Sequence, residues 1–264
     1  MTDDQAPWAR IEDSDRLREA AREVVSIVDE RLADLSSRRE LMPRHFAALG
    51  LARCNRLLTA MFALFDGELQ DAGGVYARPI FETMIVSLYS LYGGETAYEE
   101  VRGAYVQQVE RFSNIELLGE ASKRLVEGWE GPKNRLNIEQ LARRVGELLQ
   151  AEGGASSPET GQMIYDILYR GESLVGIHAG IGSVVGHLED HGNRLGVARV
   201  RQNADDGTGE LVLSAVNVIM LAYHVFKTFG IGTARLEAVW NQLTEGTTAD
   251  ALVVEREPTF KVDP

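Results

Sequence analysis

The chain has 264 residues, of which 44% are hydrophobic and 25% charged, and a formal net charge of −13. Because nucleic-acid binding draws most of its affinity from Lys and Arg on phosphates, this charge argues against a broad nucleic-acid surface. A single cysteine, Cys54, excludes an internal disulfide and a cysteine-based zinc site.

The N-terminal stretch "MTDDQAPWARIEDSD" is acidic and lacks the basic start and apolar run of a signal peptide. Apolar stretches such as "VNVIMLAYHVF" are shorter than a bilayer span requires. We therefore expect a cytoplasmic protein with no membrane partner.

Helical periodicity dominates the first half of the chain. Apolar residues recur at helical spacing after Ser14, which is suited to an N-cap. A second helix is predicted to begin near Pro43, in its first turn, and to end at Gly67.

The stretch "GVYARPIFETMIVSLYSLYGG" is apolar on nearly every side, which is typical of a central helix. Pro79 predicts that its regular part begins there, and Gly93 and Gly94 predict its end. A long helix over residues 96–127 should follow.

Two further helix starts are marked by local signals. Asn137 is a predicted N-cap of a short amphipathic helix, and Ser157 with Pro158 opens the next one. Six glycines between residues 176 and 196 disfavour a long helix, and "GVARVRQNADDGTGE" indicates a loop or a small hairpin.

A second strongly apolar helix, near residues 210–229, and a short last one complete the pattern. We expect an all-α, single-domain bundle of about eight helices, with two buried central helices near residues 78–92 and 210–229. The bundle should span residues 1–246, and residues 247–264 should form an extended tail.

His187 and His191 lie four residues apart in "VVGHLEDHGNRLG", the spacing of two zinc ligands if the segment is helical. A zincin places Glu directly after the first histidine, where this chain has Leu188. The inverted motif needs Glu before the second histidine, where Asp190 stands. Two surface histidines near a helix end are the alternative, and no metal or other cofactor is favoured.

Arg78 and Glu82 are four residues apart on the most apolar helix, so their side chains can meet. Charges on a buried helix are costly unless they are paired or used. Two interpretations stay open: a structural ion pair, or a polar pocket in which Arg78 receives an anion or orients Glu82.

In "YDILYRGESLVGIH", Tyr165, Tyr169 and Ser173 share one helix face, and His178 follows. These groups can form a hydrogen-bonded cluster, for packing alone or as the rest of a site with Arg78 and Glu82. His178 has the pKa range of a general acid or base. Ser173 lacks the partners of a hydrolase triad.

The stretches "ARPIFETMIVSLYSLYG" and "YDILYRGESLVGIHAG" resemble a family of uncharacterised helical proteins from bacteria and their phages. Its members carry an Arg-x-x-x-Glu helix and a Tyr-rich helix leading into Ser and His. The resemblance covers roughly residues 45–225 and implies a helical fold without a known activity.

A fainter similarity is to the HEPN superfamily, many of whose members are RNases of toxin and phage-defence systems. Their catalytic motif is Arg, four to six residues, then His, used across a dimer. Here Arg170 and His178 have seven residues between them. Arg39 and His45 have the permitted spacing, but Pro43 falls between them.

Three functional hypotheses follow. The first is a non-enzymatic or regulatory protein, of phage or defence type, whose interior polar cluster is structural or binds a small anionic ligand. The second is a metal-independent RNase in which Arg78 stabilises phosphate charge and His178 moves protons. The third is a metallohydrolase using His187 and His191. The apolar helices also allow a homodimer interface.

Overall fold

The computed structural model describes residues 14–35, 43–67, 69, 72–110, 129–131, 135–153, 158–166, 188–190, 195–197 and 207–244. In this part of the chain the α-helices are α1 (Ser14–Arg31), α2 (Pro43–Asp66), α3 (Gly74–Glu110), α5 (Ile138–Ala151), α6 (Pro158–Tyr165), α8 (Thr208–Thr228) and α9 (Ala234–Thr244). A short 3₁₀ turn, Leu32–Leu35, follows α1. The predicted all-α class is confirmed.

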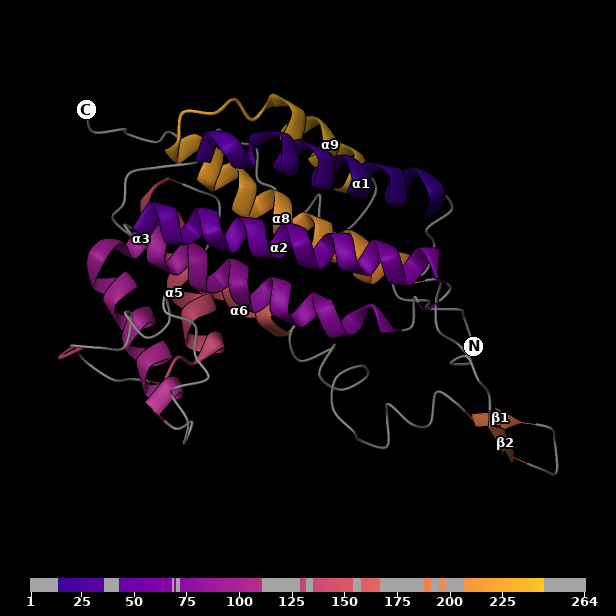
Figure 1. Ribbon diagram of the computed structural model, residues 1–264, viewed down its shortest axis with the longest axis horizontal. Coiled ribbons are helices and arrows are strands. Elements are labelled where there is room, and N and C mark those ends of the chain that lie inside the picture. Colours follow the sequence, from indigo (N-terminus) through magenta and orange to yellow (C-terminus); the bar gives the residue numbers. More distant parts are fainter. Residues whose placement is uncertain are drawn as a thin grey trace.

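The helices stack in layers (Figure 1). Helices α1 and α9 lie on one side, and α2 and α8 lie beneath them. Helix α5 packs against the other side of α3, and α6 packs against α5. The most extensive packing is between α2 and α3, and α8 contacts α1, α2 and α3. The bundle thus places α2, α8 and the N-terminal part of α3, before Gly94, at its centre.

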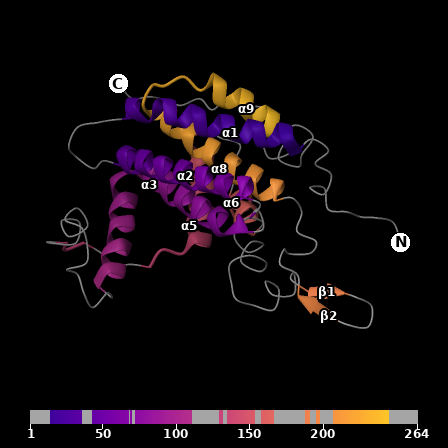
Figure 2. The same cartoon turned by 45° about the vertical axis from the view of Figure 1, so that its right-hand side comes forward.

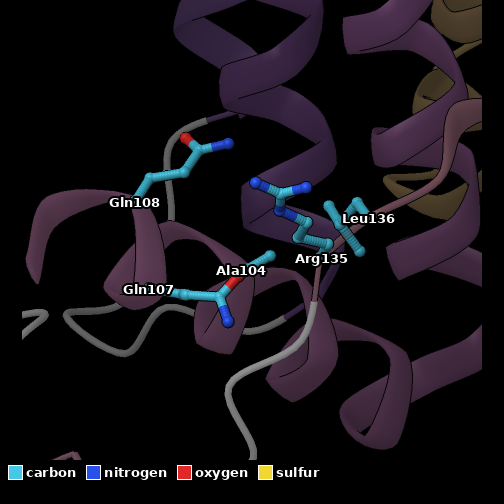
Figure 3. A pocket seen from close by; sticks show the side chains of 5 residues that line it. All are labelled: Ala104, Gln107, Gln108, Arg135 and Leu136. Carbon is cyan, nitrogen blue, oxygen red and sulfur yellow. The ribbon is translucent and has the colours of Figure 1, made fainter. Parts of the chain in front are cut away.

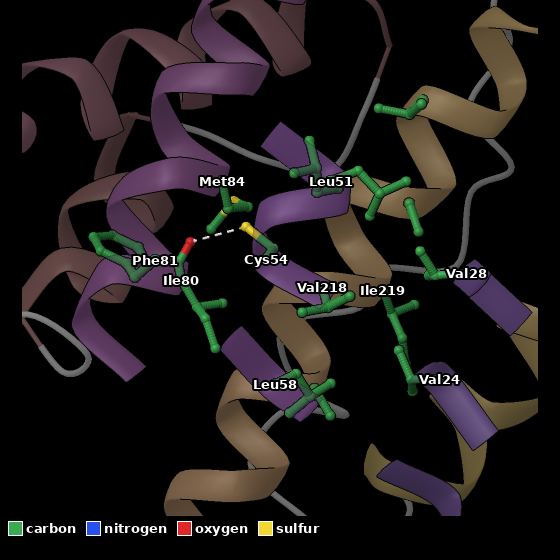
Figure 4. Packing of buried hydrophobic residues seen from close by; sticks show 14 of the residues in the cluster. Val24, Val28, Leu51, Cys54, Leu58, Ile80, Phe81, Met84, Val218 and Ile219 are labelled. Atoms are coloured by element: carbon green, nitrogen blue, oxygen red, sulfur yellow. Dashed lines mark hydrogen bonds between the residues drawn. The ribbon is translucent and has the colours of Figure 1, made fainter. Parts of the chain in front are cut away.

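Apolar side chains from four helices meet in this centre. Figure 4 shows them: Leu51, Cys54 and Leu58 of α2, Ile80, Phe81 and Met84 of α3, Val218 and Ile219 of α8, and Val24 and Val28 of α1. All ten are at most 2% exposed. The two predicted buried helices, near residues 78–92 and 210–229, are therefore confirmed as parts of α3 and α8.

Local signals placed several helix ends correctly. Helix α2 begins at Pro43 and ends one residue before Gly67. The side chain of Asn137 caps α5, because its Oδ1 accepts a hydrogen bond from the backbone N–H of Gln140 at 3.2 Å.

The predicted break at Gly94 is a kink rather than an end. Gly94 has φ 65° and ψ −152°, and helical structure continues on both sides of it from Gly74 to Glu110. A positive φ is readily adopted by glycine because it has no Cβ. In Figures 1 and 2 the second part of α3 turns away from the first. The predicted helix over 96–127 is described only as far as residue 110.

Gly93 supports the same turn by a different route. A Cβ at this position would lie 2.5 Å from the Cβ of Ala97, which is closer than real side chains approach. The pair of glycines therefore lets the chain change direction while the helix remains close-packed.

The glycine-rich region contains a small hairpin. Strand β1 (Leu188–Asp190) pairs antiparallel with β2 (Leu195–Val197), with Glu189 opposite Gly196. The hairpin lies earlier than the predicted stretch 196–210, of which residues 198–206 lie outside the described residues. The predicted tail, 247–264, lies outside them too.

The expectation that every apolar segment is too short to span a bilayer is wrong. Helices α2 and α8 are both long and apolar enough to cross a membrane by length and composition, although 44% and 56% of their most apolar windows are buried inside the bundle. Core helices of water-soluble bundles meet the same criterion. The separate apolar runs in the sequence looked too short because each helix extends beyond its most apolar run.

Candidate functional site

Arg78 and Glu82 form the predicted pair on the first part of α3. Arg78 donates from Nε to Oε1 of Glu82 at 2.9 Å. Their side chains are 22% and 36% exposed, so the pair is only partly withdrawn from water. The i, i+4 spacing therefore predicted a contact that the fold makes.

The pair sits beside the fully buried part of the same helix. Ile80 and Phe81 are both completely buried, and the thiol of Cys54 on α2 donates to the backbone carbonyl of Ile80 at 3.5 Å. Burial raises the pKa of the Cys54 thiol to about 12, so it stays protonated at neutral pH. Cys54 is thus a packing residue.

Tyr165 ends α6 and is 9% exposed within the core cluster. Beside it, Arg143 of α5 donates to Gln162, and Gln162 donates to Asp166. Gly161 brings α6 against α5, because a Cβ there would lie 2.2 Å from the carbonyl oxygen of Ala142. This close crossing fixes the start of the Tyr-rich segment.

The remaining members of the predicted cluster cannot be joined to these. Tyr169, Ser173 and His178 lie outside the described residues, as does Arg170. The structure therefore brings Arg78 to Glu82 and places Tyr165 in the core.

The helical argument for a zinc site is wrong. Residues Leu188–Asp190, between the two histidines, form a β-strand, so a shared helix face is not available to them. His187 and His191 themselves lie outside the described residues. Among the residues that the structure describes, no group of three or more His, Cys, Asp and Glu side chains is arranged to hold a metal ion.

His45, the histidine with HEPN-like spacing to Arg39, is a core residue. It is 8% exposed and meets the ring of Phe229 edge-on, with centroids 5.7 Å apart. Arg39 lies outside the described residues. A histidine enclosed in this way is poorly placed to reach a scissile phosphate.

Sequence reasoning missed a polar cluster that spans the kink, which we call the kink cluster (Tyr89, Glu100 and Arg144). The hydroxyl of Tyr89 donates to Oε2 of Glu100 at 2.6 Å, and Nη1 of Arg144 on α5 donates to the Tyr89 oxygen at 2.8 Å. The Arg144 guanidinium also lies over the Tyr89 ring. The cluster therefore ties both parts of α3 to α5.

Burial, together with the hydrogen bond and charge of Glu100, raises the pKa of Tyr89 to about 12. Tyr89 therefore stays protonated at neutral pH, and its hydroxyl donates a hydrogen bond to the carboxylate of Glu100. The kink cluster therefore stabilises the packing of α3 against α5, and Tyr89 does not act as a general base.

A second missed contact joins α3 to α8. The hydroxyl of Tyr92 lies 2.5 Å from Nδ1 of His224. Burial lowers the pKa of His224 to about 4 and raises the pKa of Tyr92. At neutral pH the imidazole is uncharged, so the hydroxyl of Tyr92 donates a hydrogen bond to Nδ1 of His224.

One signal could have found both contacts. A tyrosine on an apolar helix needs a partner for its hydroxyl, and "SLYSLYGG" places two such tyrosines before the break. His224 is the one histidine on the other apolar helix.

Comparison with protein-family models, with curated proteins and with solved structures finds no match for this chain.

Proposed function

We propose that this chain is a cytoplasmic helical binding protein, of the phage or defence type that the sequence resemblance implies, which takes a small anionic ligand beside Arg78. The observation that carries the proposal is the partly exposed Arg78–Glu82 pair on the central helix. The side chains assigned to the site are Arg78, Glu82, Tyr165, Tyr169, Ser173 and His178.

The geometry of the pair supports the role of Arg78. A hydrogen bond from Nε to Glu82 fixes the plane of the guanidinium. An arginine oriented in this way is suited to an oxyanion, because its planar fork matches the two oxygens of a carboxylate or phosphate. Glu82 is therefore a positioning residue for Arg78.

The exposure of the pair favours binding over a purely structural role. An ion pair that remains 22% and 36% exposed contributes little to stability, since water screens it. The same exposure leaves the pair within reach of a ligand from solvent.

Native mass spectrometry of the purified protein tests this proposal. We expect a retained small molecule on the wild type and its loss in Arg78→Gln. The matched control is Arg22→Gln, which breaks an ion pair of similar length, 2.6 Å, between α1 and Asp66 on α2. Retention that survives Arg78→Gln, or an equal loss in both variants, would contradict the assigned site.

The same spectrum reports the subunit count and so tests whether the chain forms the homodimer that its apolar helices allow. If the wild type carries no ligand but cleaves short RNA, and His178→Ala abolishes cleavage, the RNase hypothesis replaces the binding proposal. If the protein shows neither RNA cleavage nor a retained ligand, the Arg78–Glu82 pair is structural and the binding proposal is wrong.

A further inference from the structure

A pocket of about 220 Å³ lies between the second part of α3 and the residues that lead into α5 (Figure 3). It is far along the chain from the Arg78–Glu82 pair. Its lining residues are Ala104, Gln107, Gln108, Arg135 and Leu136.

Helix geometry explains how one wall forms. Ala104, Gln107 and Gln108 are spaced i, i+3 and i+4, so they share a face of α3. Ala104 is 4% exposed, whereas Gln108 at the rim is exposed. The wall thus combines a small apolar floor with two amide side chains above it.

The opposite wall comes from the segment before α5. Leu136 is partly buried and packs against the core cluster, and the neighbouring Arg135 is exposed. Asn137 then caps α5, so the pocket lies beside the positive end of that helix. Figure 3 shows the Arg135 side chain extending between the two walls.

The kink cluster holds the two walls in register. Glu100 lies on the same part of α3 as Gln107 and Gln108, and Arg144 lies on the helix that Arg135 leads into. Because Tyr89 bonds to both Glu100 and Arg144, the second part of α3 cannot move from α5 without breaking these bonds.

The lining chemistry selects a ligand class. The described lining residues offer one guanidinium, which can pair with a carboxylate, and two amides, which donate and accept hydrogen bonds. A volume of about 220 Å³ is below the roughly 300–1,000 Å³ of pockets that hold drug-sized ligands, so it suits a smaller molecule. Arg135 is the one cation among the described lining residues, and the net charge of −13 disfavours a highly charged anion, so a monoanion is favoured over a polyphosphate.

We infer that this pocket binds a small monocarboxylate that carries a further hydrogen-bonding group, such as a short hydroxy acid. Arg135 holds the carboxylate, Gln107 and Gln108 contact the polar substituent, and the carbon chain lies on Ala104 and Leu136. The inference is independent of the proposed Arg78 site.

Calorimetric titration with lactate tests the inference, with its neutral amide, lactamide, as the matched ligand. We expect lactate to bind and lactamide to bind at least about tenfold more weakly, because the charged hydrogen bond is lost. Inorganic phosphate that binds as well as lactate would overturn the carboxylate assignment.

Variants locate the site on the pocket. Arg135→Gln should weaken lactate binding about tenfold, while Arg56→Gln, an exposed arginine of α2, should leave it unchanged. Ala104→Leu should fill the floor and abolish binding without changing any charge. Equal affinity in wild type and Arg135→Gln, or no lactate binding to the wild type, would overturn the inference.

Discussion

The two parts of α3, before and after Gly94, differ in how they are held. The first part supplies Ile80, Phe81, Met84 and Leu88 to the central cluster, between α2 and α8. From the second part, the described core cluster includes only Ala97 and Val101. Tyr98, Ala104, Val106 and Val109 of the second part are buried outside that cluster, and the kink cluster adds polar contacts at the turn.

This difference separates stability from recognition within one helix. Close apolar packing fixes the first part and tolerates little change, since interiors are packed like crystals. The second part presents amide side chains to a pocket and is braced by hydrogen bonds. Changes before the kink should therefore affect unfolding, and changes after it should affect ligand binding more than stability.

The largest expected effect comes from the centre of the apolar part. Phe81→Ala removes a completely buried ring and should lower the free energy of unfolding by about 3–5 kcal/mol. Urea unfolding followed by circular dichroism measures this loss. A loss below about 1 kcal/mol would mean that this part of α3 is not in the core.

Acid should weaken the contact between α3 and α8. Because the pKa of His224 falls from 6.5 to about 4 on folding, the unfolded chain binds its proton first as the pH drops. Stability is full above pH 6.5 and should fall by on the order of 2–3 kcal/mol as the pH reaches 4.

His224→Asn is the matched variant, since its amide oxygen can accept the proton of Tyr92 but does not titrate. It should flatten the stability profile between pH 6.5 and 4, measured by unfolding at each pH. An imidazole pKa near 6.5 in an NMR titration of the folded protein would contradict this account.

A tight helix crossing should show a coupled effect. A Cβ on Gly50 would lie 2.0 Å from Oγ of Ser87, so Gly50→Ala should cost about 1–3 kcal/mol of stability. Ser87→Ala removes that oxygen, so the double variant should recover part of the loss. Additive losses in the double-mutant cycle would show that α2 and α3 do not cross there.

The smallest effect should come from the polar side of the comparison. Glu100→Gln removes the charge that Tyr89 and Arg144 bond to, and should cost about 1 kcal/mol at neutral pH. A loss as large as that of Phe81→Ala would erase the distinction between the two parts of α3.

The kink cluster also predicts an alkaline effect. The pKa of Tyr89 rises from 10 to about 12 on folding, so its contribution to stability is full below pH 10 and is lost as the pH rises through 12. Tyr89→Phe should reduce this alkaline loss only in part, because the pKa values of Tyr92 and Tyr98 are also raised. A profile unchanged by Tyr89→Phe would contradict the cluster.

Local patterns predicted what depends on a few neighbouring residues. Pro43, Gly67 and Asn137 marked helix ends, and the four-residue spacing of Arg78 and Glu82 predicted their contact. Each of these features depends on the chain within one or two turns.

Features set by the tertiary fold could not be predicted in this way. The contact between Tyr92 and His224 joins residues 132 positions apart. Gly94 marks a change of direction, but the sequence does not say whether a helix stops or bends there. The spacing of His187 and His191 gives a shared helix face only if the segment is helical, and that condition is not met because the intervening residues form a strand.

Hydrogen exchange along α3 tests the central claim most directly, because it compares both parts of one helix in the same molecule. We predict that the amides of residues 80–90 exchange only through global unfolding, while those of residues 98–108 exchange faster through local opening. Equal protection on both sides of Gly94, or slower exchange after it, would contradict the division of α3 into a core part and a braced, ligand-facing part.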